Sequence, residues 1–197
     1  QGLIEDVGYF GPELVQNGDF SELGPELIVN GDFATDSDWT LATGWSINNG
    51  KLRATNASLV NAFQAKIYTS GKTYEVTYTI SDYVKGQVRF QLGGGGSTVN
   101  GQNRGANGTY TEYVVATSNH TSARFRGLST DGGFTASIDN VSVKQVDPDG
   151  HWTLGGVAWS IPGKLSCDGT QTTGTNSFQD IIFDSGKTYK VVFTCII

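Results

Sequence analysis

Polar and apolar residues alternate in two short stretches, and the polar types are those that bind hydroxyl groups. Five residues on the polar side of this pattern could do so: Gln87, Arg89, Gln91, Arg124 and Arg126. Their amide and guanidinium groups can hydrogen-bond sugar hydroxyls, and an aromatic face can pack on the C–H surface of a sugar ring. Three aromatic residues lie nearby in sequence: Trp45, Tyr83 and Tyr110. The pattern predicts a glycan-binding surface, with an ordinary solvated sheet face as the alternative.

The acidic and histidine residues do not form a catalytic pattern. Glycoside cleavage needs two carboxyl groups that face each other across a cleft. The acids of this chain lie mostly in turns and near the N-terminus, with Glu75 and Glu112 the exceptions in strands. We predict that they are exposed and solvated. His120 and His151 have no serine or cysteine motif beside them, so we predict surface histidines and no enzyme activity.

Charge and composition narrow the classes of molecule that the chain could bind. The formal net charge of the 197 residues is -6, which disfavours nucleic acid because nucleic-acid binders present a basic face. No apolar run approaches the roughly 18 residues of a membrane span. We predict that Cys167 and Cys195 are buried and unpaired, with one disulfide as the alternative. The chain contains no Met and stops in an apolar run, so we expect a piece of a longer or processed product.

Alternation with period two dominates the middle of the chain and predicts strands. In residues 73–80, Tyr74, Val76, Tyr78 and Ile80 share one face, and Val88, Phe90 and Leu92 alternate in the same way. Clusters of Gly, Asn and Ser separate these runs. Seven or more short strands with such turns predict an all-β fold, an antiparallel β-sandwich or jelly roll, over residues 25–147.

Repeated phrases predict a second, incomplete copy of this unit over residues 148–197. Residues 39–54 match 152–167, and residues 63–80 match 178–195. The opening phrase also occurs twice, as ELVQNGDF at 13–20 and ELIVNGDF at 26–33.

Only the second opening phrase is followed by a whole unit, so we expect it to pair inside the sandwich and the first to pair elsewhere, with another chain. Residues 1–24 would then form an extended arm. Its partner-binding residues would be Leu3, Ile4, Val7, Tyr9 and Phe10. An arm of this kind would bind by adding a strand to a sheet edge. The alternatives are that it packs back onto its own sandwich or is the tail of a preceding module.

One predicted strand changes phase. In ASIDNVSV, residues 136–143, the apolar residues before and after Asp139 and Asn140 fall on opposite sides of the alternation. A phase slip of this kind predicts a β-bulge, a device common beside functional sites.

ELIVNGDF at the start, a Trp soon after it and ASIDNVSV at the end resemble the jelly-roll carbohydrate-binding modules of the family 4/9/22 group. The resemblance covers roughly residues 26–146. In that group a structural calcium ion often joins the first and last strands, which implies Asp32 and Asp139 as metal ligands here. The acidic residue that often follows the opening phrase is replaced by Ala34. The alternative is that both carboxylates cap turns.

The tandem arrangement is similar to virion structural proteins of bacteriophages. It implies a non-catalytic module of a tail fibre or capsid decoration on the virion surface, a homo-oligomer that contacts other virion subunits through its arm and adheres to host glycans. One alternative is an accessory carbohydrate-binding module of a secreted polysaccharide-degrading enzyme. Another is a fibre-borne depolymerase whose catalytic part lies elsewhere.

Overall fold

The structure is a computed structural model that describes residues 11–155, 159–161, 163–167, 169–170 and 174–195. Eleven strands lie within residues 11–146. Their bounds are β1 Leu23–Glu26, β2 Thr40–Leu41, β3 Trp45–Asn48, β4 Lys51–Ala57, β5 Asn61–Tyr68, β6 Thr73–Lys85, β7 Val88–Gly94, β8 Ser97–Asn100, β9 Gly108–Val115, β10 His120–Gly127 and β11 Phe134–Val146. The arm residues predicted from the sequence, Leu3, Ile4, Val7, Tyr9 and Phe10, lie outside the described residues.

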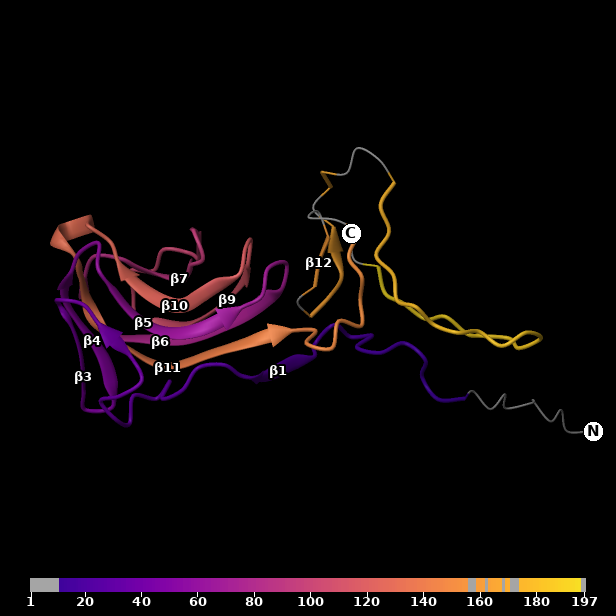
Figure 1. Cartoon of the computed structure of the whole chain (residues 1–197), viewed down its shortest axis with the longest axis horizontal. Helices are drawn as coiled ribbons and strands as arrows, with labels where there is room; N and C mark the ends of the chain where they lie inside the picture. Colours follow the sequence, from indigo (N-terminus) through magenta and orange to yellow (C-terminus); the bar gives the residue numbers. More distant parts are fainter. Residues whose placement is uncertain (1–10, 156–158, 162, 168, 171–173, 196–197) are drawn as a thin grey trace, which may run out of the picture.

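The strands form two antiparallel sheets, which confirms the predicted all-β sandwich. One sheet has the order β3-β4-β11-β6-β9, with β1 paired to β11, and the other has the order β2-β5-β10-β7-β8. We call them the β11 sheet and the β10 sheet. Figure 1 shows that the long strands are bowed in the same direction and that β10 lies inside the bend of β11. The outer face of the β10 sheet is therefore on the inner side of the curve.

The core lies between the sheets and follows the alternation of the sequence. Tyr74, Tyr78, Phe90 and Phe125 are fully buried, as the period-two pattern predicts. The Phe125 ring lies edge-on to Tyr78 at 5.1 Å and to Phe90 at 5.7 Å, which joins β6 of one sheet to β10 and β7 of the other. Edge-to-face packing of this kind stabilises the sandwich by more than the burial of apolar area alone would.

The predicted bulge is present in β11. Its register with β6 shifts between Asp139 and Ser142, and Asn140 has a φ of 52°. The shift returns Val141 and Val143 to the core side after Ile138.

The opening phrase at 26–33 runs along β11, because the Leu27 N–H donates to the Val143 carbonyl (2.9 Å) and the Val141 N–H donates to the Gly31 carbonyl (2.8 Å). Its predicted place inside the sandwich is confirmed. The copy at 13–20 does pair elsewhere, but its contacts are with residues 147–179 of its own chain rather than with another chain.

Residues 147–195 contain less regular structure than their sequence repeat predicts. The described residues there form β12 (Trp159–Ser160), β13 (Ser166–Cys167) and a single bridge between Thr153 and Phe178. Residues 179–195, which match β5 and β6, form no strand, and Figure 1 shows them as an extended loop pair. Strands need a ladder partner, and the described residues beside this segment supply none of the kind that β9, β10 and β11 supply in the sandwich.

Two further findings concern the two cysteines and the absence of a membrane-spanning helix in the described residues. Both cysteines were predicted to be buried, but Cys167 and Cys195 are exposed because neither lies in a packed core. Among the described residues there is no helix with the length and apolar character of a membrane span.

Candidate functional site

A row of side chains crosses the outer face of the β10 sheet. Residues that pair directly across antiparallel strands point to the same face, so register alone assembles the row. It runs in the order Thr40, Phe63, Arg124, Gln91 and Asn100. The apolar neighbours of these residues along each strand point inward to the core. The row therefore combines one aromatic ring with a guanidinium group and two amides.

A second row lies beside the first. Asn61 pairs with Arg126, and Arg126 pairs with Arg89. Four of the five residues predicted to bind a glycan are thus brought together on one face: Arg89, Gln91, Arg124 and Arg126. The fifth, Gln87, directly precedes β7, and its carbonyl accepts the Leu128 N–H (2.8 Å) at the edge of this face.

Contacts within the sheet hold Arg124 and Gln91 in place. Arg124 Nε donates to Ser122 Oγ (2.8 Å), and Ser122 Oγ donates to the Gly93 carbonyl (3.1 Å). A Cβ on Gly93 would collide with the Arg124 guanidinium, so glycine lets that group lie flat on the strand. Gln91 Nε2 donates to Asn100 Oδ1 (2.6 Å). The polar groups are preorganised rather than free to rotate.

Some polar atoms of this face have no protein partner. Arg89 Nε and Asn61 Oδ1 are buried and make no hydrogen bond in the described part of the chain. Buried polar atoms are nearly always paired, so this unpaired donor and this unpaired acceptor are exceptions on this face of the sheet.

The outer face of the β11 sheet is different, because its polar groups bind one another. Thr77 and Thr111 hydroxyls lie 3.0 Å apart, and Tyr113 donates to Glu75 (2.8 Å). The pKa of Tyr113 is raised by partial burial and by that bond to the Glu75 carboxylate. This face supplies a matched control for experiments on the other sheet.

The aromatic residues named from the sequence do not lie on the candidate face. Trp45 is buried against Phe134, at 6.3 Å between ring centroids. Tyr83 and Tyr110 pack against the core. The aromatic residue of the face is Phe63, which sequence reasoning missed because an apolar residue in a strand is ordinarily assigned to the core. Its position between Ala62 and Gln64, both buried on the inward side, reveals its outward direction.

Two predictions about exposed polar residues were wrong. Glu112 is only 7% exposed, because it pairs with Val76 on the inward side of β9. Its carboxylate accepts the Gln102 N–H (2.6 Å) and the Tyr78 hydroxyl (3.1 Å), so it fastens the β8–β9 loop to the core. His120 was predicted at the surface but is fully buried, because a register shift places it opposite Tyr68.

The residues proposed to hold calcium make the contacts of turn caps. Asp32 is exposed and accepts the Ala34 N–H (3.3 Å), while Asp139 accepts the Asn140 N–H (2.7 Å). Calcium takes about six to eight oxygens, so two carboxylates need other ligands. Calcium at Asp32 and Asp139 stays a prediction.

One other group of potential metal ligands occurs in the part of the chain that the structure describes: Glu22, Asp147 and His151. Asp147 already uses both carboxylate oxygens, which accept Asn17 Nδ2 (2.9 Å) and the Trp152 N–H (3.1 Å). His151 Nε2 lies 3.4 Å from the Glu22 carboxylate. These contacts account for the group without an ion.

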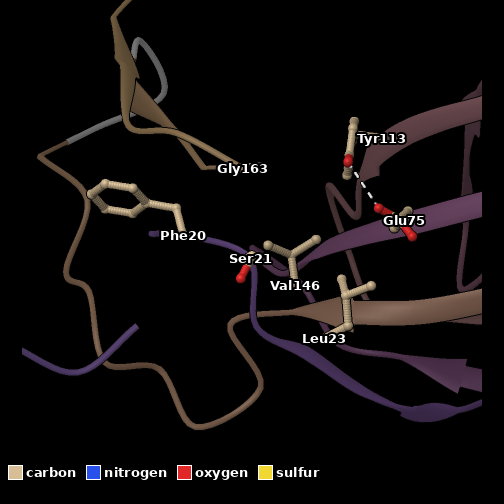
Figure 2. A pocket seen from close by; sticks show the side chains of 7 residues that line it. All are labelled: Phe20, Ser21, Leu23, Glu75, Tyr113, Val146 and Gly163. Carbon is tan, nitrogen blue, oxygen red and sulfur yellow. Dashed lines mark hydrogen bonds between the residues drawn. The ribbon is translucent and has the colours of Figure 1, made fainter. Parts of the chain in front are cut away.

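A small hollow lies where the sandwich meets the N-terminal segment, and Figure 2 shows its lining. Phe20 and Gly163 lie on one side, and Leu23, Val146 and the Glu75–Tyr113 pair lie on the other. Its volume is about 120 Å³, whereas ligand pockets usually measure about 300–1,000 Å³. Its single carboxylate, Glu75, has no second acid facing it there, so the hollow offers no glycosidase geometry.

The sequence matches no protein-family model and no curated protein. In structure, the chain is similar to a carbohydrate-binding module described as BiXyn10A CBM1, with 13% identity, a TM-score of 0.42, and coverage of 64% of this chain and 97% of the module. It is also similar to a family 4 module at 17% identity and TM-score 0.40, covering 66% and 99%.

A third similar structure is the CBM22-1 xylan-binding domain from Paenibacillus barcinonensis Xyn10C, at 13% identity and TM-score 0.40, covering 64% and 96%. Likeness at these levels does not assign a ligand to this chain, and the ligand proposed below rests on the side chains of the β10 sheet.

Proposed function

We propose that the sandwich of residues 23–146 is a non-catalytic carbohydrate-binding module whose ligand lies on the outer face of the β10 sheet. The observation that carries this proposal is the in-register placement of Phe63, Arg124 and Gln91 on adjacent strands. A sugar ring needs an apolar surface for its C–H face and planar polar groups for its hydroxyls, and Phe63 and Arg124 offer these at neighbouring positions. Gln91 is only 4% exposed and supports the row from beside Arg124.

The charge of the face favours an acidic glycan. Arg89, Arg124 and Arg126 lie together on it, and its two rows contain no carboxylate. Guanidinium groups bind carboxylates with two parallel hydrogen bonds. Because the whole chain has a net charge of -6, the positive charge of this face is local to it. We therefore propose that the ligand is a polysaccharide that carries uronic acids.

Binding calorimetry tests the site. The chain is titrated with a uronic-acid oligosaccharide and with a neutral oligosaccharide of the same length. Phe63→Ala should weaken binding of both by about tenfold, in the range of a buried aromatic contact. Arg124→Ala should weaken the acidic ligand more than the neutral one and should reduce the salt dependence of its affinity.

Tyr113→Ala is the matched control, because it removes an exposed aromatic ring from the outer face of the opposite sheet. It should leave affinity unchanged. Equal losses in Phe63→Ala and Tyr113→Ala, or no binding of any glycan by the folded chain, would remove the proposal.

For the biological setting, we propose a bacteriophage virion structural protein, a tail fibre or capsid decoration that adheres to host-surface glycans. The repetition of the module's sequence within one chain supports this setting, because repeated modules suit a spacer along a particle surface more than a single enzyme accessory. An accessory module of a secreted polysaccharide-degrading enzyme is the alternative. Immunogold labelling of purified virions with antibodies to the chain separates them, since only the first predicts labelled particles.

A further inference from the structure

The two copies of the opening phrase fold into the same turn. Asn17 and Phe20 have φ values of 47° and 57°, and Asn30 and Phe33 have values of 53° and 51°. The Phe20 N–H donates to the Asn17 carbonyl (3.1 Å), as the Phe33 N–H does to the Asn30 carbonyl (3.2 Å). A positive φ is uncommon for phenylalanine, so its recurrence shows that the copies are structural equivalents.

Each turn is held by a different tryptophan. In the sandwich, Trp39 Nε1 donates to the Asn30 carbonyl (3.2 Å), and its ring lies 5.3 Å from Phe33. In the first copy, Trp152 Nε1 donates to the Asn17 carbonyl (3.1 Å), and its ring lies 4.9 Å from Phe20. Trp152 is the residue that matches Trp39 in the sequence repeat.

A glutamine side chain makes two hydrogen bonds to the backbone of the residue just before each turn. Gln64 accepts the Val29 N–H (2.9 Å) and donates to the Val29 carbonyl (2.8 Å). Gln179 accepts the Gln16 N–H (2.8 Å) and donates to the Gln16 carbonyl (2.9 Å). Gln179 is the repeat equivalent of Gln64, so the reciprocal pair of hydrogen bonds recurs at the equivalent position of each opening phrase.

The rest of the second unit repeats other contacts of the sandwich. The Thr153–Phe178 bridge matches the Thr40–Phe63 pair, and the Trp159–Cys167 pair matches Trp45–Ala54. The Asp184 N–H donates to the Tyr189 hydroxyl (2.8 Å), as the Thr69 N–H does to the Tyr74 hydroxyl (2.7 Å). These three contacts of the second unit thus match those of their counterparts, and residues 13–20 supply the opening segment that the second unit lacks.

We infer that residues 13–20 are the opening segment of the second unit and dock in cis on a surface formed by Trp152, Gly163 and Gln179. The sandwich is then inserted between two parts of the second unit. Figure 2 shows the Phe20 side chain on the Gly163 side of the junction, and the Gly163 N–H donates to the Phe20 carbonyl (2.8 Å).

The first and last strands of the inserted sandwich lie side by side, as an inserted domain requires. Leu23 pairs with Val146, and the Asp147 N–H donates to the Glu22 carbonyl (3.0 Å). An inserted domain needs its two termini close together, as they are here. The units are then joined by two adjacent chain crossings, which restrict their relative motion more than a single linker would. This inference does not depend on the glycan proposal.

Amide hydrogen exchange of the full chain, read by NMR, tests the inference with a crossed pair of variants. Gln179→Leu should speed exchange at Gln16 by about two- to tenfold, the loss of one hydrogen bond, and should leave Val29 unchanged. Gln64→Leu should speed exchange at Val29 and leave Gln16 unchanged. Phe20→Ala should shift the indole N–H resonance of Trp152 and leave that of Trp39 in place.

Two outcomes would overturn it. If Gln179→Leu leaves Gln16 exchange unchanged while Gln64→Leu affects Val29, residues 13–20 do not dock on the second unit. If protection of Gln16 rises with protein concentration, the segment docks on another copy rather than in cis. Should Gln64→Leu prove too unstable to study, the Phe20→Ala and Gln179→Leu results decide the matter by themselves.

Discussion

Two buried tyrosines of the sandwich should respond in opposite ways to the loss of their hydroxyl groups. The Tyr78 hydroxyl donates to the Glu112 carboxylate (3.1 Å). The Tyr68 hydroxyl is buried and has no protein partner in the described part of the chain. Each replacement by phenylalanine removes one oxygen and leaves the ring in the core, so packing changes little.

The magnitudes follow from those contacts. A hydrogen bond to a charged group contributes about 1.5–3 kcal/mol, so Tyr78→Phe should lower the free energy of unfolding by that amount. An unpaired buried hydroxyl costs about 1–3 kcal/mol, so Tyr68→Phe should raise it by about 1 kcal/mol. With a urea dependence of about 2 kcal/mol per molar, the midpoints should move down by about 1 M and up by about 0.5 M.

The same tyrosines give the sandwich a dependence on alkaline pH. Burial, and then the nearby Glu112 carboxylate, raises the pKa of Tyr78 well above its usual value. Burial, followed by the charges of Tyr74 and Glu26, does the same to the pKa of Tyr68. Unfolded phenols ionise near pH 10, so the unfolded state loses protons first, and stability is full below pH 10 and falls above it.

Urea unfolding at pH 7 and at pH 10.5 measures both effects. Each phenylalanine variant should lose less stability than the parent chain between these two pH values. If Tyr68→Phe is destabilising to the same degree as Tyr78→Phe, the reasoning from hydrogen-bond partners is refuted. A variant with the parent's pH dependence would refute the assigned burial of that phenol.

Three further perturbations test the fold and the face. Gln64→Leu should lower the free energy of unfolding by about 1–2 kcal/mol, measured by urea denaturation, because two hydrogen bonds to the opening segment are lost; an unchanged midpoint would contradict this. Gly93→Ala should displace the Arg124 guanidinium and weaken glycan binding in calorimetry more than it lowers the melting temperature, whereas normal binding would show that this group does not contact the ligand. If calcium binds Asp32 and Asp139, a chelator should lower the melting temperature, and an equal melting temperature with and without chelator counts against that site.

Period-two alternation allowed much of the sandwich to be predicted. Tyr74, Val76, Tyr78 and Ile80 are buried because strand geometry points every second side chain to the same face. The phase slip at Asp139 and Asn140 predicted the bulge for the same reason. The polar pattern in β7 and β10 also placed Arg89, Gln91, Arg124 and Arg126 on outward positions, since residues 88–92 and 123–126 alternate between polar and apolar types.

The sequence by itself could not say which strands are neighbours, because pairing between distant segments depends on the closure of the whole sheet. Register placed Phe63 beside Arg124, turned Glu112 into the core against Tyr78, and buried His120. Local pattern determined the shape of the turn at residues 13–20, since the shared Asn-Gly-Asp-Phe sequence forms the same turn in both places. Its partner, Trp152, was decided by the tertiary structure, because the matching surface lies beyond the whole intervening sandwich in the chain.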